Sequence, residues 1–336
     1  MRSLGGRRNG VIQRADTARQ IGRSIGHRQL RDCFQGALLG IHLLPTALCP
    51  IRAASDWPSD LSLARSRIQQ AVDCSLAQTR SFVLGPNDWT VDLGLQNPAL
   101  LLPACVPVLL RYHDSWRRRF DRLMLLQLQM DSLQADAARV WLGAIAQSLM
   151  VGDLLEVLSF DDLQLASKTD WLAWLTDCAE RYRIAPSLHA QYEALLCAMR
   201  GAGAIRAQPG DALGDDDESR RSFVVGVRSA LNCPESYVLA VQCLSGYPSN
   251  RTAVLGDVVL GDAAQTDGQE AARATEAIAS DWTAAFVAGL LSGAFGGGSS
   301  LPALWRARLD VDIPQDLAAR LFSLWAGELS SASLSD

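Results

Sequence analysis

The chain has 336 residues and a formal net charge of −5 at pH 7. Of its residues 49% are hydrophobic and 20% are charged, which excludes a disordered chain and provides enough apolar side chains for a core. The acidic balance makes nucleic acid an unfavourable partner. We therefore expect a globular protein that does not bind nucleic acid.

The N-terminal segment differs in composition from the rest of the chain. Residues 1–31 hold eight arginines and one acid, Asp16, and chain ends of this kind are usually poorly ordered. We expect residues 1–30 to form a flexible basic tail. No segment has the roughly 20 uninterrupted apolar residues that a membrane span needs, so we expect a cytoplasmic protein without a membrane partner.

Apolar residues recur at helical spacing along most of the chain. In the first half this pattern predicts a buried helix over 32–48, a helix over 60–80, a helix over 99–112 broken by prolines, and a helix or helix pair over 116–150. These helices account for nearly all apolar residues of the N-terminal half, which favours an all-α fold.

The second half continues the helical pattern. Two or three shorter helices are expected over 153–200, with Asp170 and Ser187 as N-caps. A glycine-rich and acidic loop is expected over 201–221, and helices resume near Ser222. The last helices are expected over 281–295 and 314–330, and one strand signal, over 254–260, has only helical neighbours.

Two small-residue motifs carry a family resemblance. Gly36–Gly40 reads Gly-Ala-Leu-Leu-Gly, and Ala288–Gly297 is a small-residue helix that is followed by Leu301-Pro302-Ala303-Leu304-Trp305. This pair resembles the ends of the ADP-ribosylglycohydrolase family. Glycine or alanine at every third or fourth position lets helix backbones approach closely. The resemblance implies an all-α, compact, single-domain, multi-helix fold of that type.

The resemblance divides the chain into three parts. Residues 1–30 are the basic tail, residues 31–310 are an ADP-ribosylglycohydrolase-like helical domain, and residues 311–336 are a C-terminal helix and tail.

The resemblance also implies a cleft with two Mg²⁺ ions that position ADP-ribose and a water molecule. Two such ions need several carboxylate ligands. The family's first acid is replaced here at Leu44-Pro45, and two acids of its C-terminal helix fall on Ser280 and Trp282. The remaining metal-ligand candidates, all of them vestigial, are Asp60, Asp262, Asp281 and Thr283. Asp60 and Asp281 are also typical of acids at helix N-termini.

We therefore expect an ADP-ribosylglycohydrolase-like protein with a degraded metal site, no catalytic residues and no cofactor. Its role would be binding or regulation rather than catalysis. Its partner would be an unknown protein or an ADP-ribose-like ligand. One alternative is an active Mg²⁺-dependent hydrolase that removes ADP-ribose from modified proteins through Asp60, Asp262 and Asp281. A second alternative is a structural or assembly factor that uses arginines 117–119 and the acidic segment 211–218.

Overall fold

The computed structural model describes residues 29–44, 59–84, 98–128, 135–159, 170–201, 215–234, 236–243, 282–307 and 312–327. Within these ranges the chain forms helices joined by short turns, and no strand occurs. The prediction of an all-α fold is confirmed for this part of the chain. The isolated strand signal over 254–260 lies outside the described residues.

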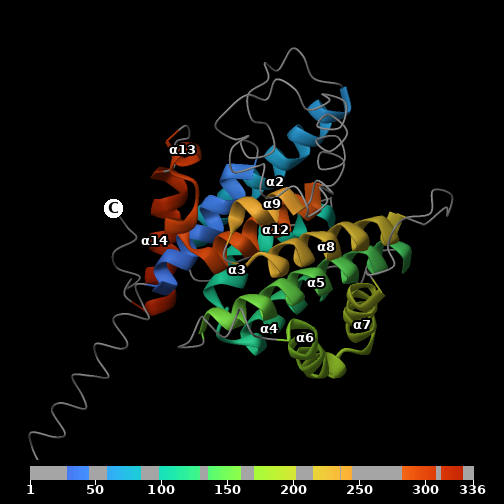
Figure 1. Cartoon of the computed structure of the whole chain (residues 1–336). Coiled ribbons are helices and arrows are strands. Elements are labelled where there is room, and N and C mark those ends of the chain that lie inside the picture. The colour runs from blue at the N-terminus through green and yellow to red at the C-terminus, as the bar shows by residue number, and fades with distance from the viewer. Residues whose placement is uncertain are drawn as a thin grey trace, which may run out of the picture.

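Within each described range, consecutive helices are joined by short turns (Figure 1). After the helix of residues 29–44, they are α2 (Ser59–Leu84), η2 (Pro98–Leu100), α3 (Leu101–Arg111), α4 (Trp116–Leu128), α5 (Ala135–Glu156), η3 (Val157–Ser159), α6 (Trp171–Glu180), η5 (Arg181–Ile184), α7 (Pro186–Gly201), α8 (Asp215–Asn232), α9 (Tyr237–Cys243), α12 (Trp282–Gly296), η7 (Gly298–Ser300), α13 (Ala303–Arg306) and α14 (Asp312–Ala326).

Two predicted helix starts have different outcomes. Asp170 caps α6 as expected, because its side chain accepts hydrogen bonds from the backbone N–H groups of Leu172 and Ala173. The prediction for Ser187 is wrong, since α7 begins at Pro186 and Ser187 lies in its first turn. Proline is favourable at a first helical position, where the missing N–H has no helical partner to lose.

The prediction of a loop over 201–221 is wrong for residues 215–221, and residues 202–214 lie outside the described part of the chain. Helix α8 begins at Asp215, so the acidic run over 215–218 is helical rather than part of a surface loop. Acids are favoured in the first turn of a helix because they interact with the positive end of its dipole. The acidic composition therefore marks a helix start here.

The two small-residue motifs meet in the core. The helix of residues 29–44 packs on α12 so closely that a Cβ atom on Gly36 would overlap the carbonyl oxygen of Gly293. The phenol of Tyr237 donates a hydrogen bond of 2.5 Å to the carbonyl of Gly40. Residues Ala284–Ala294 of α12 are all buried, and Figure 1 shows this helix in the centre with α8 and α9 beside it.

The end of α12 is fixed by a turn that contacts the first described helix. Gly297 has a φ of 73°, a left-handed conformation that favours glycine. After it, Ser299 donates from its backbone N–H and its hydroxyl to the Asp32 carboxylate, at 3.2 and 2.7 Å. The glycine turn of the C-terminal motif thereby joins α12 to the N-terminal motif.

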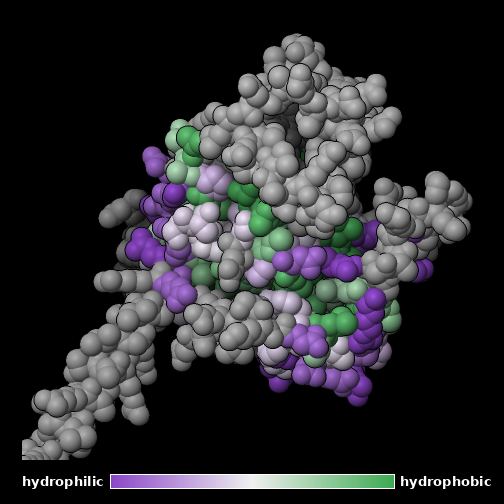
Figure 2. All heavy atoms as spheres, viewed as in Figure 1, coloured by the Kyte–Doolittle hydropathy of each residue, from purple (hydrophilic) through white to green (hydrophobic). Residues whose placement is uncertain are grey.

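The surface carries both polar and apolar regions. Hydrophilic side chains gather over α6 and α7 at the lower edge in Figure 2, whereas apolar side chains are visible in the middle, around α9. Leu239 on α9 is 38% exposed and Ile184 in η5 is 69% exposed. No helix within the described ranges is long and apolar enough to span a membrane.

Candidate functional site

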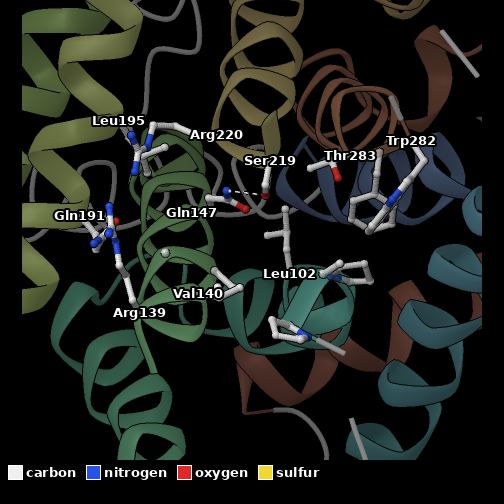
Figure 3. A pocket seen from close by; sticks show the side chains of 16 residues that line it. Leu102, Arg139, Val140, Gln147, Gln191, Leu195, Ser219, Arg220, Trp282 and Thr283 are labelled. Carbon is white, nitrogen blue, oxygen red and sulfur yellow. Dashed lines mark hydrogen bonds between the residues drawn. The ribbon is translucent and has the colours of Figure 1, made fainter. Parts of the chain in front are cut away.

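A pocket of about 280 Å³ lies where η2, α3, α5, α7, α8 and α12 meet (Figure 3). Helical spacing explains which side chains reach it. On α5, Arg139, Gly143 and Gln147 are four residues apart and share one face. Gln191 and Leu195 have the same spacing on α7. The pocket is therefore built by helix faces, not by one contiguous motif.

The polar part of the lining comes from four helices. Its polar side chains are Arg139, Gln147, Gln191, Ser219, Arg220 and Thr283. The described lining residues include two guanidinium groups and no carboxylate. Their formal charge is positive, which favours an anionic occupant over a cationic one.

Gln147 is the most buried of these polar side chains, with 8% of its surface exposed. Its amide nitrogen donates to the Ser219 hydroxyl at 3.3 Å, which is long for a hydrogen bond (Figure 3). A primary amide has two donor hydrogens and a carbonyl acceptor. Gln147 can therefore offer a ligand either a donor or an acceptor from the pocket lining.

The remaining wall is apolar and includes aromatic rings. Phe286 and Leu102 line the pocket and are buried, and Trp282 is half-buried and packs against the core. In Figure 3 the indole of Trp282 lies on the side of α12, whereas Arg139, Gln191 and Arg220 lie on the opposite side. The pocket thus has an aromatic end and a cationic end.

Of the predicted metal-ligand candidates, the structure places one in this pocket. Thr283 lines it, next to Trp282, the residue that the sequence resemblance aligns with an acid of the family. Asp60 is the second residue of α2, but its side chain lies outside the described part of the structure, as do Asp262 and Asp281 altogether. That Asp60, Asp262 and Asp281 lie together in one site stays a prediction.

The described surroundings of Thr283 do not fit a binuclear magnesium site. Mg²⁺ requires near-octahedral oxygen ligands, usually with carboxylates among them. The lining offers hydroxyl and amide oxygens but no carboxylate, and its two arginines would repel dications. Among the residues that the structure describes, no group of three or more His, Cys, Asp or Glu side chains could hold a metal ion.

A second polar cluster, which sequence analysis missed, surrounds Arg119. This side chain is fully buried and donates to Asp153 at 2.9 Å and to Glu156 at 2.8 Å. Its other terminal nitrogen donates to the backbone carbonyls of Tyr112 and His113. The expectation that arginines 117–119 form one surface is therefore wrong for Arg119, because its guanidinium points into the core.

Two tyrosines complete the cluster around Asp153. The hydroxyls of Tyr182 and Tyr192 donate to its carboxylate at 2.9 and 2.8 Å. Burial raises the pKa of the Asp153 carboxyl, while Arg119 and the two hydroxyls oppose that rise. Burial and the nearby carboxylate raise the pKa of both phenols, so they remain neutral donors. Both terminal nitrogens of Arg119 and both carboxylate oxygens of Asp153 have hydrogen-bond partners, whereas the Arg119 Nε has none among the described residues. This buried network indicates a structural role.

The chain matches no family model, no curated protein and no solved structure. The likeness to ADP-ribosylglycohydrolases therefore rests on the two motifs whose packing is described above.

Proposed function

We propose that the protein is a non-catalytic, cytoplasmic binding protein of ADP-ribosylglycohydrolase type. Its pocket would hold the anionic part of a nucleotide-like ligand without a metal ion. The observation that carries this proposal is the lining itself, which combines Thr283 of the resembling helix with Arg139, Arg220 and no described carboxylate. Arginine binds phosphate and carboxylate groups with several directed donors.

The same lining supports a binding role over catalysis. Cleavage at an anomeric carbon ordinarily uses two carboxyl groups, or a metal ion with an activated water molecule. Here an indole, that of Trp282, stands beside Thr283, at a position that the resemblance aligns with an acid of the family. Glutamine and arginine side chains orient an anion, but they do not act as general acid and base at neutral pH.

Calorimetric titration of the full chain with ADP-ribose tests this proposal. We expect binding in EDTA that is unchanged when Mg²⁺ replaces EDTA. The Arg220→Gln variant should bind about tenfold more weakly or worse, because it loses a charged donor in the pocket. Arg228→Gln is the matched control, since it removes the same charge from α8 outside the pocket lining.

An enzyme assay tests the alternative that the protein is an active hydrolase. Mg²⁺-dependent release of ADP-ribose from a modified protein would contradict the proposal and favour the active hydrolase. Loss of that release in Asp60→Asn, Asp262→Asn and Asp281→Asn variants would then assign the activity to those acids. Binding of ADP-ribose only in the presence of Mg²⁺ would contradict the metal-free pocket.

A further inference from the structure

The side chain of His113 is fully buried in the turn between α3 and α4. Its Nδ1 donates a hydrogen bond of 2.8 Å to the Leu110 carbonyl oxygen. Because that bond uses the Nδ1 proton, Nε2 of the neutral ring carries no hydrogen. Nε2 is buried and has no hydrogen-bond partner among the described residues. Protonation would therefore place an N–H donor where these residues offer no acceptor, which is costly.

Aromatic rings from two other helices cover His113. The centroid of Phe34, from the helix of residues 29–44, lies 5.5 Å from the imidazole, and that of Trp325, from α14, lies 5.3 Å from it. Phe322 of α14 meets Phe34 edge to face at 5.8 Å. The indole N–H of Trp325 also donates to the Asp114 carboxylate at 3.2 Å. Helix α14 therefore closes over the imidazole through its rings and is joined to the same turn.

The charged groups that act on His113 come from its own turn, from α4 and from α5. Asp114 and Glu156 favour the protonated ring, whereas Arg119 disfavours it. The helix of residues 29–44 and α14 meet the imidazole with the aromatic rings just described. Burial outweighs both carboxylates and the hydrogen bond to the backbone, so the pKa of His113 lies below its ordinary 6.5.

The backbone of His113 is fixed by hydrogen bonds on both sides. Arg119 donates to the carbonyls of Tyr112 and His113, and the backbone N–H of His113 donates to the Leu110 carbonyl at 3.3 Å. Helix α14 has 15 residues, and helices of that length are marginal in water without packing. Elements of this kind open locally before the whole fold does. A charged imidazole therefore reaches water by displacement of α14, not by rotation of its own backbone.

We propose that His113 is a pH-sensitive latch for α14, so that protonation of its ring releases this helix from the helix of residues 29–44 and from the turn at Asp114. The latch is separate from the pocket, because none of the described pocket-lining residues belongs to α14. The neutral ring keeps α14 docked above a pH of about 6.5, and the docked fraction decreases as the pH falls through that value.

Hydrogen–deuterium exchange of the full chain, read by mass spectrometry at pH 7.5 and pH 5.5, tests the latch. Opening of α14 takes up one proton, so its equilibrium constant increases by up to about tenfold for each unit that the pH falls below 6.5. After correction for the intrinsic exchange rate, peptides of α14 should lose about threefold to tenfold in protection at pH 5.5. Peptides of α12, whose residues Ala284–Ala294 are buried, should not change.

Variants with a side chain that does not titrate separate the latch from other effects of pH. His113→Phe keeps an aromatic ring beside Phe34 and Trp325 but takes up no proton, so its α14 protection should be the same at both pH values. His113→Gln is a second variant of this kind if His113→Phe does not fold. His189→Gln is the matched control, because it removes a histidine from α7 whose side chain is 24% exposed, and it should respond like the wild type.

Three results would overturn the latch. The first is equal α14 protection at pH 7.5 and pH 5.5 in the wild type. The second is the same loss of α14 protection in the wild type and in a folded variant with Phe or Gln at position 113. The third is an equal loss in α12 and α14, which would indicate unfolding of the whole chain instead of release of one helix. The comparison of α12 with α14 uses the wild type alone, so it decides the matter even if neither variant folds.

Discussion

The guanidinium group of Arg119 is buried, so its contribution to stability depends on its ion pairs with Asp153 and Glu156. Removing one member of a buried ion pair leaves the other charge uncompensated and typically costs about 3–5 kcal/mol. We expect Arg119→Met to lower the free energy of unfolding by that amount, because Asp153 is itself 0% exposed. Urea unfolding monitored by circular dichroism measures the change.

The adjacent residue provides the control. Arg118 is exposed on α4, so Arg118→Met should change the free energy of unfolding by less than about 0.5 kcal/mol. Equal losses in the two variants would show that the ion pair with Asp153 is not the source of the effect.

His113 should make stability depend on pH. Its ring is buried between Phe34 and Trp325, and its Nδ1 donates to the Leu110 carbonyl at 2.8 Å. Burial lowers the pKa of His113 below the ordinary 6.5, against the opposing effects of Asp114 and Glu156. The unfolded chain therefore binds the proton more readily, and stability decreases as pH falls through 6.5.

Chemical unfolding at several pH values measures this dependence. Between pH 7 and pH 5 the wild type should lose stability with a contribution from His113 of at most about 1.4 kcal/mol per pH unit. His113→Gln should show a flatter slope over the same interval. Identical slopes would mean that the ring is not kept neutral by the fold.

At the scale of elements, the close contact between the helix of residues 29–44 and α12 depends on glycines, which have no side chain. Gly293→Ala would place a methyl group against the carbonyl of Gly36, so the two helices must separate. Overpacking of this kind typically costs about 1–3 kcal/mol. Differential scanning calorimetry should show a lower melting temperature for Gly293→Ala.

Gly143→Ala is the comparison within α5. Its added methyl group has open space, so the better helix propensity of alanine should raise stability by about 0.5–1 kcal/mol. A melting temperature for Gly293→Ala at or above that of the wild type would refute the close helix contact.

Sequence patterns predict the helices of this chain better than they predict which side chains meet when the helices pack. The small residues of 36–40 and 288–297 predicted close helix packing, and the structure confirms it, because such spacing has few other uses. The burial of Arg119 was not predictable, since its partner Asp153 lies 34 positions away in the chain. The acidic run before Ser222 was misassigned because acids suit both a loop and a helix start.

The candidate site was less predictable than the fold. Thr283 was predicted as a vestigial metal ligand and Trp282 as the replacement of an acid. Both line the pocket, but those roles stay predictions. Gln147, Gln191 and Arg220 were not identified, because each is an ordinary polar residue on an amphipathic helix. Only the packing of α5, α7 and α8 against one another brings these three side chains to a common space.

At the scale of the whole molecule, the central claim is that this pocket binds an anionic ligand without a metal ion. Ligand that binds only the folded state raises stability, by about 2.7 kcal/mol at a concentration 100 times the Kd. Thermal unfolding of the full chain with ADP-ribose and EDTA measures this directly. The account predicts a higher melting temperature for the wild type and no increase for Gly143→Leu, whose side chain would fill the pocket because Gly143 lines it and its Cβ position has no neighbour nearer than 4.0 Å. An increase that requires Mg²⁺, or that persists in Gly143→Leu, would contradict the account.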